Sequence, residues 1–142
     1  MLKYKAYSYW KVKMKISELS AATKVPSKTI RYYEQVGLLS APSRAENGYR
    51  SYAENDIETL LFIRRCRELN IAIEDIKQLV DVQQNPKASC SVVDNIIADQ
   101  LARIQQTQRE LSLLEKSLAS LSVSCQNQHV EDCSILNTLK SQ

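Results

Sequence analysis

The chain has 142 residues, 44% of them hydrophobic and 25% charged, and a formal net charge of +3. This length suits about one domain, and the lack of any run of about 18 apolar residues excludes a membrane-spanning helix. The first residues are basic and aromatic without an apolar segment, so we expect no signal peptide and a cytoplasmic protein. In such a protein, the four cysteines indicate free thiols or metal ligands rather than a disulfide framework.

The charge is unevenly distributed along the chain. Residues 1–70 carry 13 Lys and Arg against 7 Asp and Glu, a net charge of +6, whereas residues 71–142 carry 6 against 9, a net charge of −3. A basic N-terminal half favours a polyanionic partner, although an ordinary solvated basic face would look similar. Residues 1–13 show no periodicity, and we assign this N-terminal extension no role.

Two short helices joined by a tight turn are predicted after this extension. Apolar residues spaced three apart indicate the first, with Ser17 as its expected N-cap, and residues 27–36 form the second, which Gly37 ends. A helix-turn-helix presents its second helix to DNA, where arginine reads guanine edges and lysine and hydroxyl groups hold phosphates. This helix carries six polar or aromatic residues, several of which must face outward: Ser27, Lys28, Thr29, Arg31, Tyr32 and Tyr33.

Neighbouring residues on a helix point about 100° apart. We therefore expect Tyr32 and Tyr33 to divide between the surface and the core.

A β-hairpin is predicted next, because Asn47 and Gly48 form a strong turn signal. It would carry Arg44, Tyr49, Arg50 and Tyr52. A basic hairpin beside a helix-turn-helix is a wing that contacts the DNA backbone. Helices follow over residues 54–69 and 73–82. Cys66 lies on the first of these, and we expect it to pack in the core because no other thiol is near in sequence.

A polar connection over residues 83–90 leads to a long helix predicted over residues 91–124. No glycine or proline interrupts this stretch, and apolar residues recur at steps of 4, 3, 7, 3, 4 and 3. Such a narrow coiled-coil-type row suits one partner helix. The row consists of Ile97, Leu101, Ile104, Leu111, Leu114, Leu118 and Leu121.

Three of the cysteines lie at the two ends of this predicted helix. Cys90 precedes it, and Cys125 and Cys133 flank a polar loop beyond it that also carries His129. Cys90 and Cys125 are 35 residues apart. At about 1.5 Å per helical residue they cannot share a ligand within one chain.

If two copies of the helix pair antiparallel, Cys90 of one copy lies beside Cys125 and Cys133 of the other. Three thiolates suit soft divalent metal ions. His129 is a candidate fourth ligand, and the alternative is that it is a loop residue that faces the solvent. On spacing alone, a structural dimer helix with incidental thiols explains the pattern equally well.

The strings KTIRYYEQVGLL, ENGYRSY and FIRRCRELNIAIEDIKQLV resemble the MerR family of transcriptional regulators, and the resemblance extends from Met14 to Leu139. The distal half is similar to the metal-sensing branch. Cys90 stands four positions after Pro86, as in the cadmium- and lead-responsive subgroup. The family's zinc sensors carry this cysteine one residue later, with a cysteine pair at the loop entrance, and its copper(I) sensors have serine there.

The resemblance implies a mainly α fold with a winged helix-turn-helix head (residues 14–82), a linker (83–90), an antiparallel coiled-coil dimerisation helix (91–124) and a metal-binding loop with a short C-terminal helix (125–142). It implies that Arg31, Tyr32, Tyr49 and Arg50 contact DNA, with Lys28 and Thr29 as neighbours on that surface.

The implied function is that of a homodimeric activator on double-stranded promoter DNA, acting with RNA polymerase by distorting the DNA when Cd(II) or Pb(II), or else Zn(II) or Hg(II), binds. The alternatives are a thiol redox-responsive regulator and a Zn(II) or Cu(I) sensor on the same scaffold. We expect no enzyme, because the sequence indicates no oriented Cys–His pair, oxyanion hole or substrate pocket.

Overall fold

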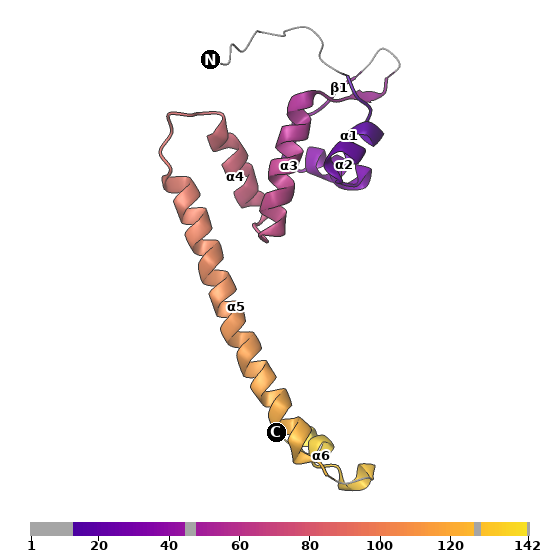
Figure 1. Ribbon diagram of the computed structural model, residues 1–142, viewed down its shortest axis with the longest axis vertical. Helices are drawn as coiled ribbons and strands as arrows, with labels where there is room; N and C mark the ends of the chain where they lie inside the picture. Colours follow the sequence, from indigo (N-terminus) through magenta and orange to yellow (C-terminus); the bar gives the residue numbers. More distant parts are fainter. Residues whose placement is uncertain (1–12, 45–47, 127–128, 142) are drawn as a thin grey trace, which may run out of the picture. The chain divides into compact units, whose positions relative to one another are not determined.

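The computed structural model describes residues 13–44, 48–126 and 129–141. The chain divides into two units, residues 1–96 and residues 97–142, which are described separately (Figure 1). No helix in the described part of the chain combines the length and apolar character needed to cross a membrane. In chain order the elements are α1 (Ile16–Thr23), α2 (Ser27–Gln35), β1 (Ser43–Arg44), β2 (Arg50–Ser51), α3 (Glu54–Glu68), α4 (Ile73–Gln83), α5 (Ser91–Ser124), the 3-10 helix η1 (Val130–Asp132) and α6 (Ser134–Lys140).

The predicted helix-turn-helix is formed by α1 and α2, which pack against each other. Between them, the buried Thr23 hydroxyl donates to the Leu19 carbonyl at 2.8 Å and accepts the Val25 amide at 3.3 Å. Lys24 adopts the left-handed conformation (φ +57°) that ends α1. Gly37 (φ +78°) follows α2, a conformation that glycine adopts at little cost.

The prediction of Ser17 as the N-cap of α1 is wrong, because Lys15 is the N-cap and Ser17 lies inside the helix. The reason is a long-range contact. Met14 pairs with Tyr52 through two backbone hydrogen bonds of 2.9 Å, which hold the chain extended up to the first helical turn.

The predicted wing is present. Strands β1 and β2 run antiparallel, with Ser43 opposite Ser51 and Arg44 opposite Arg50. Gly48 has φ +81°, as the turn prediction requires, whereas Asn47 lies outside the described residues.

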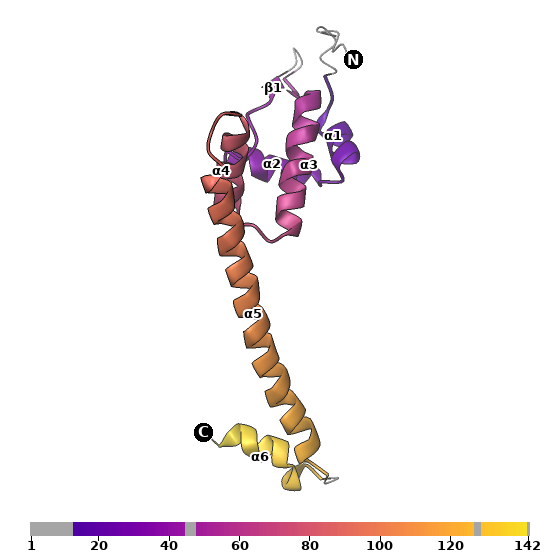
Figure 2. The ribbon, with the colours of Figure 1, turned by 60° about the vertical axis from the view of Figure 1, so that its left-hand side comes forward.

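The core of the first unit lies where α3 packs against α1 on one side and α4 on the other (Figures 1 and 2). Arg64 of α3 donates to the Thr23 carbonyl at 3.1 Å, which ties α3 to the turn between α1 and α2. Ile96 of α5 is also in this core, so the first turns of α5 belong to the head. The buried hydrophobic residues are Leu19, Val25, Ile30, Tyr33, Leu38, Leu39, Tyr52, Leu60, Ile63, Cys66, Ile71, Ile76, Leu79 and Ile96.

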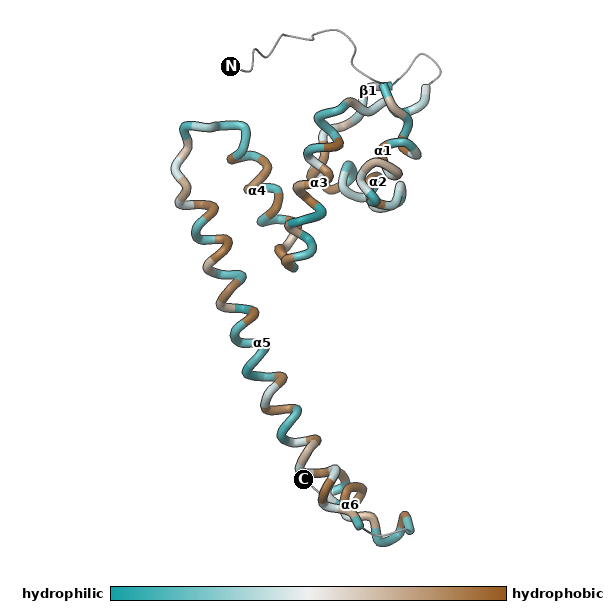
Figure 3. The backbone as a smooth tube through the Cα atoms, viewed as in Figure 1, coloured by the Kyte–Doolittle hydropathy of each residue, from teal (hydrophilic) through white to brown (hydrophobic). Residues whose placement is uncertain are grey.

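In the second unit, the remainder of α5 exposes most of its apolar row. Apolar and polar positions alternate along this helix (Figure 3). The exposed members of the row, with exposed fractions between 38% and 67%, are Ile97, Leu101, Ile104, Leu111, Leu114 and Leu118. The short helix α6 starts beside the end of α5 (Figures 1 and 2).

Candidate nucleic-acid interface and metal centre

The outward face of α2 carries three of its four candidate DNA contacts. Lys28, Arg31 and Tyr32 are exposed, Tyr32 with 47% of its surface, whereas Tyr33 is 8% exposed and belongs to the core. The expected division of the two tyrosines is therefore confirmed. Residues three and four apart share one face of a helix, so Lys28, Arg31 and Tyr32 form one continuous polar surface.

Arg31 lies in a hollow of about 670 Å³ between α2, the start of α1 and the wing. The predicted wing residues Tyr49 and Arg50 line the same hollow. It therefore gathers four cationic side chains, which suits a phosphate backbone. The full lining is Lys15, Ile16, Ser17, Arg31, Arg44, Gly48, Tyr49 and Arg50.

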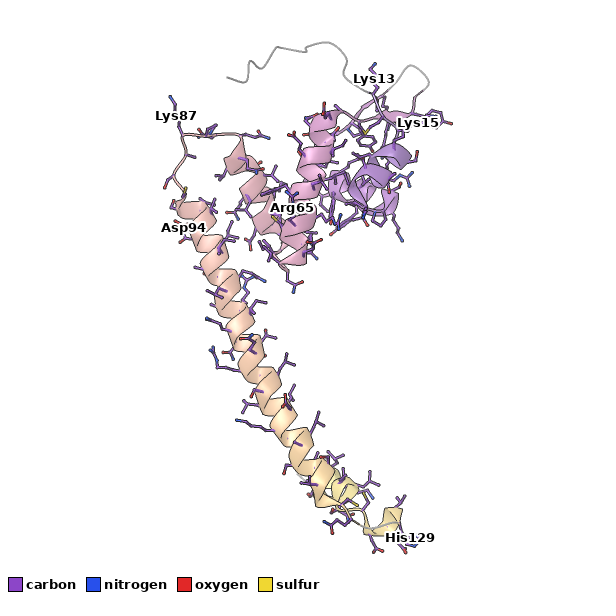
Figure 4. All side chains as sticks on the ribbon, in the orientation of Figure 1. Lys13, Lys15, Arg65, Lys87, Asp94 and His129 are labelled. Carbon is purple, nitrogen blue, oxygen red and sulfur yellow. The ribbon has the colours of Figure 1, made fainter. Side chains whose placement is uncertain are left out.

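Sequence reasoning missed Lys15 as a member of this surface. Lys15 precedes α1, and its side chain is exposed near the wing (Figure 4). The pairing of Met14 with Tyr52 brings this part of the chain to the wing, and a periodicity along the sequence does not reveal such a contact.

Glu34 connects the wing to α2. The Glu34 carboxylate accepts a hydrogen bond from the Tyr52 hydroxyl and lies 3.4 Å from Arg50 Nε, and its side chain is only 7% exposed. Burial, and then the hydrogen bond to Glu34, raise the pKa of Tyr52 well above its usual range. Because one carboxylate holds both contacts, the position of Arg50 is set relative to the helix that carries Arg31.

Thr29 is separate from this surface. It lines a second hollow of about 340 Å³, to which α3 contributes two further arginines. Its partly buried side chain lies on the side of α2 that faces the core. The lining is Lys24, Val25, Pro26, Thr29, Tyr33, Arg64, Arg67 and Glu68.

Cys90 stands at the start of α5 with an exposed side chain. Its carbonyl accepts the Asp94 amide at 2.9 Å, so its backbone is held by the first turn of the helix. The Cys90 thiol is therefore exposed on a backbone segment that the first turn of α5 holds in place.

Cys125 and Cys133 are half-buried at the two ends of the loop between α5 and α6. Ser124 directly precedes Cys125 and Ser134 directly follows Cys133. The Ser134 hydroxyl donates to the Ser124 carbonyl at 2.7 Å, which closes the loop beside both cysteines. His129 is exposed between them (Figure 4).

Cys66 is separate from these thiols. It is buried in the head, and burial raises the pKa of its thiol, which favours the neutral form over a metal-binding thiolate. Among the described residues of one chain, no three His, Cys, Asp or Glu side chains gather closely enough to hold a metal ion. Thiolate is a donor that soft metal ions prefer, so the exposed Cys90 and the half-buried Cys125 and Cys133 are each candidate thiol ligands.

Comparison with known proteins identifies the family. The profile described as "MerR HTH family regulatory protein" matches residues 14–83, and the one described as "MerR, DNA binding" matches residues 57–121. The chain is 34% identical over 126 residues to "Heavy metal-dependent transcription regulator 2" of Rhizobium meliloti, covering 89% of this chain and 86% of that protein.

Two solved structures also resemble the chain. The regulator PbrR691 from Ralstonia metallidurans CH34, in complex with lead(II), has a TM-score of 0.82 at 36% identity, covering 89% of this chain and 98% of that one. The dual function regulator MerR of Bacillus megaterium MB1, in complex with mercury(II), has a TM-score of 0.68 at 30% identity, covering 90% and 100%. The winged head, the long helix and these similarities agree: the chain belongs to the MerR family of helix-turn-helix transcription regulators, not to a family of enzymes.

Proposed function

We propose that the chain is a metal-responsive activator that binds promoter DNA as an antiparallel homodimer and responds to a soft divalent ion, Cd(II) or Pb(II) before Zn(II) or Hg(II). The observation that carries this proposal is the pair of half-buried cysteines at a loop closed by Ser124 and Ser134. The relatives bound to lead(II) and mercury(II) support a soft metal without choosing between the ions.

The DNA-contacting surface is the outward face of α2 together with the wing. Arg31 reads base edges, and Lys28, Tyr32, Tyr49 and Arg50 contact the backbone or neighbouring bases. Thr29 acts at the second hollow, where Arg64 and Arg67 supply positive charge. Two such heads in a symmetric dimer match a palindromic operator.

The exposed row on α5 is the dimerisation surface. Apolar side chains at heptad-like steps form a seam that one partner helix covers, and a second copy of the chain offers the same seam. In the antiparallel arrangement, the start of one α5 lies beside the end of the other. Cys90 of one copy then joins Cys125 and Cys133 of its partner.

Three thiolates around a divalent ion leave a net charge of −1, whereas around Cu(I) they would leave −2, so Cys90 favours divalent ions. Cys125 and Cys133 of one copy and Cys90 of the other would hold the ion, which would thereby link the two copies. His129 is the candidate fourth ligand, which a tetrahedral ion such as Zn(II) uses. The thiols release protons on binding, so metal affinity falls at acid pH.

Activation follows if metal binds more tightly to the arrangement of heads that distorts the promoter. DNA distortion costs several kcal/mol, and it aligns the promoter elements for RNA polymerase. The chain's own contribution is to hold two heads on DNA and to couple their orientation to the thiol sites.

Mixing two variants tests whether the site is shared between copies. Cys90→Ser protein and the double variant Cys125→Ser/Cys133→Ser should each bind Cd(II) weakly as homodimers. Their heterodimer should recover one three-thiol site, measured as one tightly bound Cd(II) per dimer by competition with a chromophoric chelator. A heterodimer without such a site would exclude the shared arrangement, and Cys90→Ser protein that retains full induction would remove Cys90 from the site.

The closed loop also fits a second candidate function, a thiol redox switch through a reversible Cys125–Cys133 disulfide. Elemental analysis of the reduced protein separates the two. About one divalent ion per site supports metal sensing, and no metal together with loss of thiols on oxidation supports the redox switch.

A further inference from the structure

We infer that Ser134 is a positioning residue that holds the two loop cysteines ready for metal before any metal binds. This inference rests on the proposed metal-sensing function and adds the residue that prepares the site. It starts from the contact in which the Ser134 hydroxyl donates to the Ser124 carbonyl at 2.7 Å.

This hydrogen bond joins the end of α5 to the start of α6, directly beside the two loop cysteines. Ser124 is the last residue of α5 and Ser134 is the first of α6. The final carbonyls of a helix have no partner within the helix, and here a hydroxyl from across the loop supplies one. Since each serine is the direct chain neighbour of a cysteine, the bond also fixes how far apart Cys125 and Cys133 can move.

The surrounding hydrogen bonds strengthen this reading. The Ser124 hydroxyl donates to the Leu121 carbonyl at 2.8 Å, which holds Ser124 in the last turn of α5. Thr138 donates to the Ser134 carbonyl at 2.7 Å, and the Asn137 amide donates to the Cys133 carbonyl at 3.1 Å. Both ends of the Ser124–Ser134 bond are therefore anchored in helices.

A closed loop lowers the entropy lost when two ligands at its ends converge on one ion. Without the Ser134 hydroxyl the metal must itself close the loop. One net hydrogen bond corresponds to about a fivefold change in a binding constant. We therefore expect Ser134→Ala to weaken metal binding about fivefold.

The test uses the full-length protein and Cd(II) as the probe. Ser134→Ala should bind Cd(II) about fivefold more weakly than the original chain, and Ser134→Thr, which keeps a hydroxyl, should bind as the original does. Ser122→Ala is the matched control, because its hydroxyl donates to the Ala119 carbonyl at 2.8 Å on α5 and does not reach the loop. Equal Cd(II) affinities for Ser134→Ala and the original chain would overturn the inference.

A second measurement needs no metal. In a Cys90→Ser background, oxidised glutathione converts the two loop thiols to a disulfide and is reduced to two molecules of glutathione. The equilibrium constant for this exchange should fall about fivefold in Ser134→Ala and remain unchanged in Ser122→Ala. An unchanged constant in Ser134→Ala overturns the positioning role. Failure of the original chain to bind Cd(II), with the exchange constant lowered as expected, would overturn the metal-sensing function alone.

Discussion

Two adjacent leucines on α5 provide a direct test of the dimerisation surface. Leu113 and Leu114 are both exposed, with 64% and 60% of their surfaces accessible. Only Leu114 belongs to the apolar row, since it follows Leu111 by three residues and precedes Leu118 by four. We expect Leu114→Ala to weaken the dimer strongly and Leu113→Ala to leave it nearly unchanged.

The magnitude follows from the surface that Leu114 has left to bury. Leucine to alanine removes about three carbon groups, each worth about 0.8 kcal/mol when fully buried. With 60% of the side chain still exposed, the loss is about 1.4 kcal/mol per chain. Both copies carry the change, so the dimer loses about 3 kcal/mol, a rise in its dissociation constant of roughly 100-fold.

Sedimentation equilibrium on the metal-free protein measures this dissociation constant. The helix propensity changes in the same way in both variants, so their difference reports the contact alone. If Leu113→Ala weakens the dimer as much as Leu114→Ala does, the row is not the seam. If neither changes the dissociation constant, α5 is not the dimerisation surface.

The remaining predictions concern the head and the loop. Arg31→Ala should lower affinity for promoter DNA by about 1–3 kcal/mol and reduce its salt dependence, whereas Arg65→Ala, which removes an exposed charge that lines neither hollow, should bind almost normally. Thr23→Val should lower the free energy of unfolding by about 1–3 kcal/mol in urea titrations, because the buried Val25 amide loses the hydroxyl that accepts its hydrogen bond. The raised pKa of Tyr52 means that the folded state holds this proton more tightly than the unfolded state does. The contribution of Tyr52 to the free energy of unfolding is therefore fully present below about pH 10 and is lost as the pH rises above it. Tyr52→Phe should reduce this loss, measured as urea midpoints from about pH 8 to 11. His129→Ala should weaken Zn(II) binding more than Pb(II) binding in competition titrations, and equal losses would contradict its assignment as a ligand.

Elements that depend on local chemistry could be predicted from the sequence. The bounds of α5 match the prediction at both ends, because the absence of glycine and proline and the apolar periodicity act within the helix itself. Gly37 and Gly48 likewise take the positive φ angles that their turns require. The start of α1 was misplaced, since the pairing of Met14 with Tyr52 sets it from a distant part of the chain.

In the candidate site, too, residues whose place depends on local sequence could be predicted, and residues placed by long-range contacts could not. Arg31 and Arg50 were predicted from a basic helix and a hairpin signal, and they line one hollow. Glu34 was missed, because an acidic residue in a basic helix has no visible role until the fold brings Tyr52 and Arg50 to it. Thr29 was grouped with Arg31 by its place on the helix, whereas packing against α3 puts it at another hollow.

If Cys90 ligates metal as proposed, its placement would let the distant loop act on the DNA-binding head. The Cys90 carbonyl is bonded to the first turn of α5, and Ile96 in the next turns is part of the head's core. In the proposed site, a ligand bond at Cys90 would therefore act on backbone that the head itself holds. Because coupling between two binding equilibria is reciprocal, the proposed mechanism predicts that promoter DNA in its distorted form tightens metal binding by the same factor by which metal favours that form. A regulator in which only one of the two effects occurred would not be coupled through its thiols.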